Sequence, residues 1–240
     1  MIVQCERAKV PMANTIDPVF TPETLKVPEL ISQILHDDLA SKPSLQLVGC
    51  VDKDPKTAAI ILAGGTGERF GREGGKQLFE IAGKPILTWS AEAFDAVGDI
   101  GLIVIVCPED RKEEYLKRAI DPFPFATPVV ITASGALRQE SAYLGLEAVP
   151  DDFEFVVIHD GARPLVTPEL ILHTINTVKG NIDADGAVVA HPAIDTLKVV
   201  EDGAIVGTPD RSVFWVAQTP QVFRAGIYRR AHAAALSDGF

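Results

Sequence analysis

The chain has 240 residues, of which 47% are hydrophobic, and this size suits one α/β domain with an appendage. A formal net charge of -11 argues against general affinity for nucleic acid or an anionic membrane, so anionic ligands must rely on local basic clusters. No apolar stretch approaches the ~18 residues of a membrane span. The three cysteines are scattered and form no CxxC pair, which indicates neither a disulfide framework nor a zinc site and favours the reducing cytoplasm.

Residues 1–56 differ in composition from the rest of the chain and are interpreted as an N-terminal extension. They contain several prolines and one amphipathic candidate helix, from Pro28 to Leu39. Two interpretations of the segment stay open: a helix packed on the main domain, or a segment that docks a partner.

The first predicted strand, Ala58–Leu62, leads into a glycine-rich loop. Glycines let main-chain N–H groups approach a phosphate closely, because no Cβ is in the way. Arg69 and Lys76 add mobile positive charge in the same loop. Gln77 follows that lysine where a Walker A loop needs Ser or Thr, and Phe70 stands where a dinucleotide fingerprint needs a third glycine. The loop is therefore predicted to hold a nucleotide triphosphate, with an ordinary glycine-rich turn as the alternative.

Strands and helices alternate after this loop. Further strands are expected at Ile100–Val106, Val129–Thr132, Phe155–His159 and Ala187–Ala190. Helices are expected at Pro85–Val97, Glu109–Ala119, Arg138–Val149, Pro168–Val178 and Ala225–Leu236. Such alternation predicts an α/β fold with a mostly parallel sheet covered by helices on both faces. Ligands of such sheets sit at the carboxyl ends of the strands, so residues 64–76, 133–138 and 160–163 are expected to converge on one side.

The alternation breaks over residues 192–215, where two short apolar runs flank an Asp202-Gly203 turn. This pattern predicts a β-hairpin arm. An isolated two-stranded hairpin is marginally stable in water, so the arm is expected to need a partner surface.

Five segments of the chain match one enzyme family in the same order. They are the glycine-rich loop from Leu62 to Gln77, Gly135–Ser141, His159–Pro164, Asp195–Lys198 and Gln218–Gln221. Over roughly residues 57–236 the chain therefore resembles the 2-C-methyl-D-erythritol 4-phosphate cytidylyltransferase family of the sugar-phosphate nucleotidylyltransferases. The resemblance implies a domain over residues 57–240 with a three-layer Rossmann-like nucleotidyltransferase fold and a hairpin arm. It also implies transfer of CMP from CTP to 2-C-methyl-D-erythritol 4-phosphate, release of pyrophosphate and use of Mg²⁺.

The same resemblance assigns roles to the motif residues. Arg69, Lys76 and Arg211 are expected to be catalytic, the first two as cations that stabilise charge on the α-phosphate and the departing pyrophosphate. Nucleotide contacts are expected from Ala63, Gly64, Gly65, Gly67, Gly135, Arg138, Ser141 and Asp160. Acceptor contacts are expected from Arg163, Thr196 and Lys198. Asp160 is also the candidate for the metal, through a Mg²⁺-bound water.

Simpler alternatives exist for several of these residues. Ser141 could be an ordinary serine in the first turn of a helix, and Asp160 could cap a helix or a turn. Arg211 could be a surface arginine. Lys76 fits a solvated loop lysine. His159 is interpreted as structural, because attack by an already ionised phosphate needs no imidazole.

The chain departs from the family pattern at two places. Ala136 stands where the family often has an acidic residue, and the pattern stops at Phe240, before a lysine and an aspartate expected for the acceptor phosphate and the metal. Two other functions stay open: ribitol 5-phosphate as the acceptor, or a nucleotide-binding module without turnover. The family also implies a homodimer, in which the arm reaches into the neighbour's site.

Overall fold

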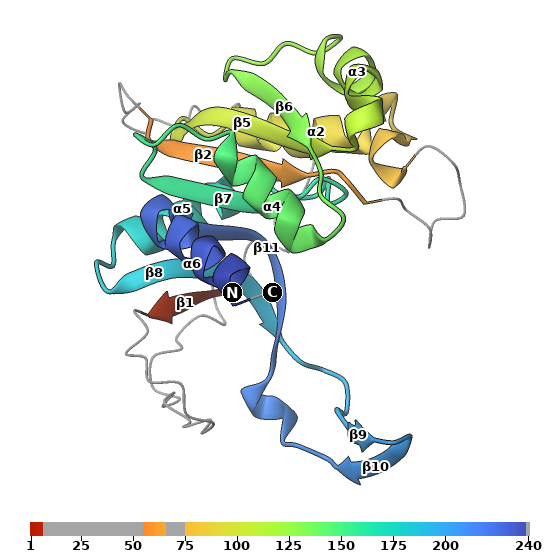
Figure 1. Cartoon of the computed structure of the whole chain (residues 1–240), viewed down its shortest axis with the longest axis vertical. Helices are drawn as coiled ribbons and strands as arrows, with labels where there is room; N and C mark the ends of the chain where they lie inside the picture. The colour runs from red at the N-terminus through yellow and green to blue at the C-terminus, as the bar shows by residue number, and fades with distance from the viewer. Residues whose placement is uncertain (7–54, 66–74, 239–240) are drawn as a thin grey trace, which may run out of the picture. The chain divides into compact units, whose positions relative to one another are not determined.

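The computed structural model describes residues 1–6, 55–65 and 75–238. The candidate helix from Pro28 to Leu39 lies outside these residues. In the described part of the chain, one sheet of seven strands has the order β1-β8-β11-β7-β2-β5-β6 (Figure 1). The strand bounds are β1 (Ile2–Glu6), β2 (Thr57–Leu62), β5 (Ile100–Cys107), β6 (Val129–Ala133), β7 (Phe155–Asp160), β8 (Ala184–Pro192) and β11 (Trp215–Arg224).

The centre of the sheet is parallel. β2 pairs in parallel with β5 and with β7, and β5 pairs in parallel with β6. β11 runs antiparallel between β7 and β8, so β8 points the same way as the central strands. The predicted mostly parallel sheet is confirmed, with β11 and β1 as the antiparallel members.

Strand β11 was not predicted from the sequence. Its middle carries Pro220, which has no N–H to give to a ladder and normally argues against a central strand. The register between β11 and β8 shifts between Ala217 and Gln221, so the proline falls where regular pairing is interrupted. The strand is therefore continuous in the chain but irregular in its hydrogen bonds.

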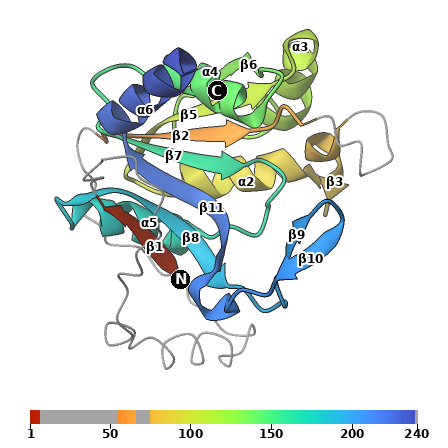
Figure 2. The same cartoon turned by 60° about the horizontal axis from the view of Figure 1, so that its bottom comes forward.

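Strand β1 was also unexpected, because all of residues 1–56 were interpreted as an extension of the main domain. Ile2–Glu6 instead pairs antiparallel with β8 at the edge of the sheet, with Val3 opposite Val188 (Figure 2). Ile2 packs against the main core. Five residues without a local partner give no hairpin signal, so this long-range pairing could not be inferred from the sequence.

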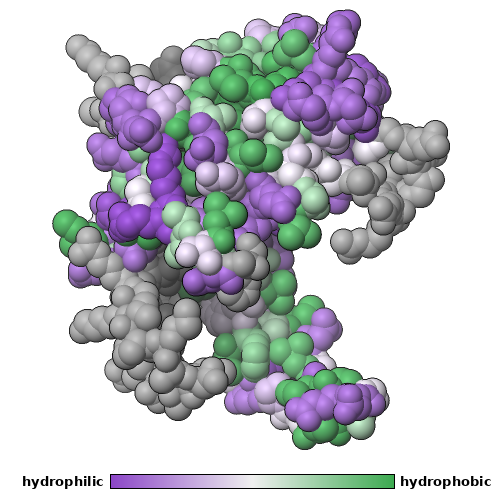
Figure 3. Space-filling view, viewed as in Figure 1, coloured by the Kyte–Doolittle hydropathy of each residue, from purple (hydrophilic) through white to green (hydrophobic). Residues whose placement is uncertain are grey.

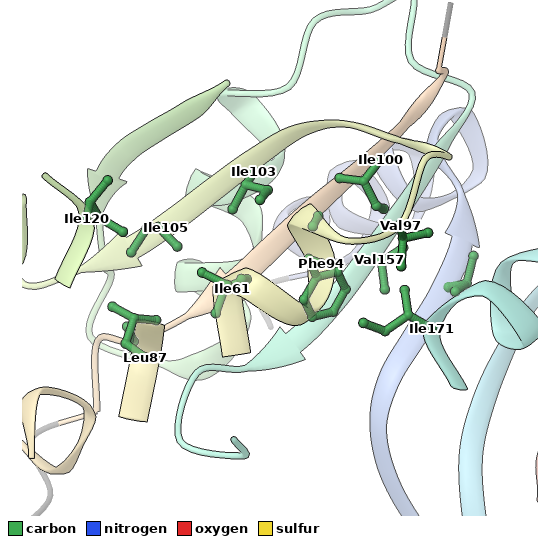
Figure 4. Packing of buried hydrophobic residues seen from close by; sticks show 14 of the residues in the cluster. Ile61, Leu87, Phe94, Val97, Ile100, Ile103, Ile105, Ile120, Val157 and Ile171 are labelled. Atoms are coloured by element: carbon green, nitrogen blue, oxygen red, sulfur yellow. The ribbon is translucent and has the colours of Figure 1, made fainter. Parts of the chain in front are cut away.

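Helices cover both faces of the sheet (Figure 2). Their bounds are α2 (Ile86–Asp95), α4 (Arg138–Glu147), α5 (Pro168–Lys179) and α6 (Ala225–Ser237). On the face of α2 and α5, Ile61 of β2 packs in one core with Phe94 (Figure 4). On the face of α4 and α6, Ile60 packs with Leu146. Strand β2 is thus buried on both faces, which explains its unbroken apolar sequence.

The helix predicted over Glu109–Ala119 is divided into three short turns. They are η4 (Glu109–Arg111), α3 (Lys112–Tyr115) and η5 (Leu116–Ile120), of which η5 is a π-helical turn. The Asp121 N–H donates to the Leu116 carbonyl at 2.9 Å, five residues back. This wider turn brings Tyr115 and Ile120, which are also five residues apart, into the same core.

The predicted hairpin arm is confirmed as β9 (Val199–Glu201) and β10 (Ala204–Gly207), and it extends away from the sheet (Figure 1). Asp202 and Gly203 have φ of 49° and 78°, the positive values that such a two-residue turn requires. The arm exposes many apolar side chains (Figure 3): Ile194, Val199, Val200, Ile205, Val206, Val213 and Phe214. Among the described residues, no helix is long and apolar enough to cross a membrane.

Candidate active site

A cleft of about 580 Å³ opens where the loops after β2, β6 and β7 meet. This is the carboxyl edge of the parallel strands, the usual ligand position in open α/β sheets. Its lining consists of Leu62, Gly64, Gly65, Lys76, Gln77, Gly135, Ala136, Leu137, Arg138, Ser141, Asp160, Ala162 and Arg163. The convergence predicted for the three loops is confirmed for their described residues.

The glycine-rich loop begins after β2 at a position with no room for a side chain. A Cβ on Gly64 would lie 2.3 Å from the Cβ of Ser134, so only glycine fits at this position. Ala63 is fully buried and is not among the residues that line the cleft. Its N–H donates to the Val106 carbonyl at 2.7 Å, and its carbonyl accepts from the Tyr115 hydroxyl at 3.1 Å. Gly67 and Arg69 lie outside the described residues.

Lys76 lines the cleft with an exposed side chain at the start of the short turn η3 (Lys76–Leu78). Gly75 precedes it with φ of 70°, a conformation that favours glycine. The chain then forms a small hairpin from β3 (Glu80–Ile81) and β4 (Lys84–Pro85) before α2. The Lys84 ammonium contacts Glu92 of α2 at 2.6 Å, which ties the hairpin to the helix.

Gln77 is a cleft residue that sequence reasoning missed, since it served there only to exclude a Walker A loop. Its side chain is 2% exposed, and its Nε2 donates to the Gly65 carbonyl at 3.3 Å. This contact joins the beginning of the glycine-rich loop to its end. A polar residue beside Lys76 was visible in the sequence, but nothing local indicated that it would be buried.

The loop before α4 is shaped by two side chains of that helix. The Ser141 hydroxyl accepts from the Gly135 N–H at 3.1 Å and lies 3.0 Å from the Leu137 carbonyl, to which it donates. The Glu140 carboxylate accepts from the Ala136 N–H at 2.8 Å. Ser141 is therefore a first-turn serine that holds this loop, and at the same time it lines the cleft.

Asp160, at the end of β7, joins two arginines across the cleft. Its carboxylate accepts from Arg138 Nη2 at 3.0 Å and from Arg163 Nε at 2.9 Å. Burial alone would raise the pKa of Asp160, but the hydrogen bonds and charges of Arg138 and then Arg163 hold it below its usual value. The carboxyl is therefore ionised at neutral pH and fixes both guanidinium groups.

Gln218 is a second neighbour that sequence reasoning did not assign to the site. Its Oε1 accepts a hydrogen bond from Arg163 Nη1. The matched segment Gln218–Gln221 thus reaches the cleft from β11, a strand whose position the sequence did not reveal.

Three predicted site residues lie on the arm and do not line this cleft. The Lys198 ammonium donates to the Thr208 hydroxyl at 2.8 Å, and Arg211 Nη1 donates to the Ile194 carbonyl at 2.7 Å. Thr196 precedes Lys198 by two residues, in the segment before β9. The fold of a single chain therefore brings the loop residues together and leaves the arm residues apart.

The cleft is locally cationic on a chain of net charge -11. Of the charged side chains that line it in the described residues, Lys76, Arg138 and Arg163 are positive and Asp160 is negative. An anionic ligand with several phosphates suits this balance. Within the described ranges, no group of three His, Cys, Asp or Glu side chains could hold a metal ion.

Comparison with known proteins gives one consistent family. Residues 57–240 match the family described as 2-C-methyl-D-erythritol 4-phosphate cytidylyltransferase. A protein of that name from Caldanaerobacter subterraneus subsp. tengcongensis is 40% identical over 184 residues, which cover 76% of this chain and 80% of the relative. A second relative of the same name, from Geobacter metallireducens, is 40% identical over 185 residues, covering 76% of this chain and 78% of its own length.

Solved structures agree with this result. A crystal structure of 4-diphosphocytidyl-2C-methyl-D-erythritol synthase from Anaerococcus prevotii has a TM-score of 0.65 and 27% identity, over 77% of this chain and 76% of that one. The crystal structure of the 2-C-methyl-D-erythritol 4-phosphate cytidylyltransferase of Thermus thermophilus has a TM-score of 0.57 and 28% identity, over 76% of this chain and 77% of that one.

The Rossmann-like sheet, the cationic cleft at its carboxyl edge and these relatives together define a nucleotidyltransferase. The class covers enzymes that move a nucleotidyl group between phosphates. Within it, the chain belongs to the 2-C-methyl-D-erythritol 4-phosphate cytidylyltransferase family.

Proposed function

We propose that this chain transfers CMP from CTP to 2-C-methyl-D-erythritol 4-phosphate and releases pyrophosphate. The observation that carries the proposal is the cleft in which Lys76, Arg138 and Arg163 gather beside the glycine-rich exit of β2. Donor and acceptor are both anions, and positioned cations are the parts that their reaction requires. Family membership and the names of the relatives support this particular donor and acceptor.

The chemistry needs no strong base, because the acceptor's phosphate is already ionised near neutral pH. One of its oxygens attacks the α-phosphorus of CTP and forms a new P–O bond. The bond from that phosphorus to the oxygen bridging to the β-phosphate breaks, and pyrophosphate leaves with the electron pair. Lys76 is proposed to stabilise the negative charge that develops on these oxygens, and Arg69 is proposed for the same role.

The nucleotide and the acceptor are proposed to occupy different parts of the cleft. The residues proposed for the nucleotide are Gly64, Gly65, Gly67, Gly135, Arg138, Ser141 and Asp160. Arg163 is proposed for the acceptor phosphate, which a guanidinium binds well through two parallel hydrogen bonds. Ala63 supports the loop from below rather than by direct contact, since it is fully buried.

Mg²⁺ is part of the proposal, and Asp160 is the residue that would hold it. The Asp160 oxygens each accept one hydrogen bond from an arginine, and a carboxylate has about four lone-pair sites, so acceptor capacity remains. When bound, Mg²⁺ neutralises part of the triphosphate charge. One carboxylate with phosphates and water suits this metal better than a closed protein cage.

Pyrophosphate release tests the function directly. The protein would be incubated with CTP, Mg²⁺ and either 2-C-methyl-D-erythritol 4-phosphate or ribitol 5-phosphate. We expect release with the first acceptor at least tenfold faster than with the second, about 1.4 kcal/mol of discrimination. Release with ribitol 5-phosphate alone would select that acceptor instead. Measurable CTP binding without release in either reaction would select a nucleotide-binding module.

The arm is proposed to complete the site of a second copy of the chain. It exposes several large apolar side chains, and a two-stranded hairpin is marginal without a partner surface. Arg211, Thr196 and Lys198 on this arm do not reach the cleft of their own chain. A homodimer in which each arm serves the neighbouring cleft accounts for both observations.

Mixing two impaired variants tests this exchange. Arg211→Ala should raise the KM for the acceptor or lower kcat while leaving CTP binding unchanged. A dimer of Lys76→Ala with Arg211→Ala would then contain one cleft with intact Lys76 that receives the intact Arg211. We expect unfolding and refolding the two variants together to restore up to about a quarter of wild-type activity per chain, as random pairing dictates. No recovery despite a dimeric mass by light scattering would place the arm's action within its own chain, and a monomeric mass at micromolar concentration would reject the dimer.

A cytoplasmic location also belongs to the proposal. The scattered cysteines support it, and Cys107 is a buried free thiol whose pKa burial raises to about 11. Such a thiol is unreactive and suits a packing role in β5.

A further inference from the structure

His159 precedes Asp160 at the end of β7 and is fully buried. Its ring lies 5.2 Å from the ring of Phe94 on α2. The charged neighbours that act on its pKa are Asp160 and Arg163, both on the same loop. Burial is the larger effect and lowers the pKa of His159 to about 4, so the ring is neutral at physiological pH.

The contacts of this ring fix which nitrogen carries the proton. Nε2 lies 3.3 Å from the Arg163 carbonyl, which can only accept, so Nε2 is the donor. The Thr219 hydroxyl already accepts from the Asp160 N–H, and donating its own proton to Nδ1 satisfies both groups, so Nδ1 is assigned as the acceptor. The Thr219 hydroxyl lies 2.9 Å from Nδ1 and donates to it. The same hydroxyl oxygen accepts from the Asp160 N–H at 3.3 Å.

These bonds form one continuous chain from donor to acceptor. It begins at the Asp160 N–H, passes through the Thr219 hydroxyl and the His159 ring, and ends at the Arg163 carbonyl. Its two ends are the two ends of the turn that carries Asp160 and Arg163. A direct bond from the Arg163 N–H to the Asp160 carbonyl at 3.0 Å closes the turn itself.

The chain of hydrogen bonds also ties this turn to β11. Thr219 follows Gln218, whose side chain accepts from Arg163. The backbone of the turn and the guanidinium of Arg163 are therefore held by adjacent residues of one strand. A cooperative series of hydrogen bonds in a buried setting is stronger than isolated bonds in water, so it restricts the turn's position.

We propose that His159 and Thr219 are positioning residues, which hold the Asp160–Arg163 turn at the geometry that the transfer reaction requires. The kinetic part of this inference rests on the proposed function. Neither side chain lines the cleft, so both act through the turn and not on the substrates. Small displacements of positioned groups have large effects on rate, because the reacting phosphates must be aligned.

A matched set of threonine variants tests the kinetic part. Thr219→Val keeps the shape but removes the hydroxyl, and we expect kcat/KM to fall on the order of 10-fold or more. Thr219→Ser restores a hydroxyl and should recover most of that loss. Thr174→Val is the control: Thr174 is also a buried threonine, on α5, and its hydroxyl donates to the Leu170 carbonyl at 2.7 Å. It does not line the cleft.

The measurements are made well below the unfolding midpoint of each variant. A purely structural role predicts that Thr219→Val and Thr174→Val both lower thermal stability and leave kcat/KM unchanged. Equal kinetics for these two variants would overturn the inference. If Thr219→Val does not fold, the position of the proton on the His159 ring decides it.

Nuclear magnetic resonance of the wild-type protein gives a test that needs no activity. Two-bond ¹H–¹⁵N correlations of the histidine rings, assigned by loss of one set in His159→Gln, report which ring nitrogen is protonated. We expect His159 to show a proton on Nε2 and none on Nδ1 at neutral pH. A proton on Nδ1 would overturn the hydrogen-bond chain. If the proton is found on Nε2 but the protein releases no pyrophosphate, the proposed function is rejected, and the hydrogen-bond chain through His159 and Thr219 is still supported.

Discussion

Replacing Lys76 by Ala is expected to lower kcat by about 10²–10³, the effect typical of removing one preorganised charge from a transition state. Lys76 lines the cleft beside the glycine-rich exit of β2, where charge would develop on the α-phosphate and pyrophosphate. In the proposed role, the ammonium group would interact with this charge more strongly in the transition state than in bound CTP. The loss should therefore appear in kcat more than in the affinity for CTP. Steady-state pyrophosphate release and CTP titration measure the two quantities.

Lys117 provides the matched control for this prediction. It is an exposed lysine in η5 that pairs with Glu113 at 2.6 Å on the surface. Lys117→Ala removes the same charge from the protein as a whole, and its kcat should stay at the wild-type value. A similar loss for both variants would indicate a general electrostatic effect. An unchanged kcat in Lys76→Ala would show that Lys76 has no catalytic role and is a solvated loop residue.

Replacing Asp160 by Asn should lower kcat/KM by about 10², because one carboxylate positions both arginines of the cleft. The Asn amide oxygen can accept from Arg138 or from Arg163, and the amide NH₂ then faces the remaining guanidinium as a second donor. One arginine therefore loses its anchor. We also expect a higher Mg²⁺ concentration for half-maximal activity, which a magnesium titration of the initial rate would measure.

The pH dependence of wild-type activity adds to this test. The folded pKa of Asp160 lies below its unfolded value, so the ion pairs are fully present above the unfolded pKa. They are lost only as the pH falls through the lowered folded pKa. Activity should therefore not decline through protonation of Asp160 until the pH drops below the ordinary aspartate range. A control variant is Asp152→Asn, an exposed carboxylate paired with Lys56 at 3.0 Å, which should leave both the rate and the magnesium requirement unchanged.

The central strands, four of the helices and the hairpin arm were predictable because their signals are local. Apolar runs such as Ile100–Cys107 and the Asp202-Gly203 turn define their own structure within a few residues. The convergence of the loops followed from the parallel sheet. Strands β1 and β11 were not predictable, because the partners of both are distant in sequence and β11 carries a proline.

The residues of the candidate site also fall into two groups, those that the sequence could predict and those that it could not. Lys76, Arg138, Asp160 and Arg163 could be selected from their motifs, and the structure brings them together. Gln77 and Thr219 could not be selected, because their importance lies in burial and in contacts across 12 and 60 residues of sequence. The arm residues Thr196, Lys198 and Arg211 were selected by resemblance, and a single chain does not bring them to the cleft.

The pairing of β1 with β8 has a practical consequence for anyone who trims this gene to the boundaries shared with its relatives. Such a truncation at residue 57 would remove β1 and uncover the edge of β8 over the residues that β1 pairs with, Ala184 to Val189. Bare edges recruit strands from other molecules, so the shortened protein would be prone to aggregate although its cleft was untouched.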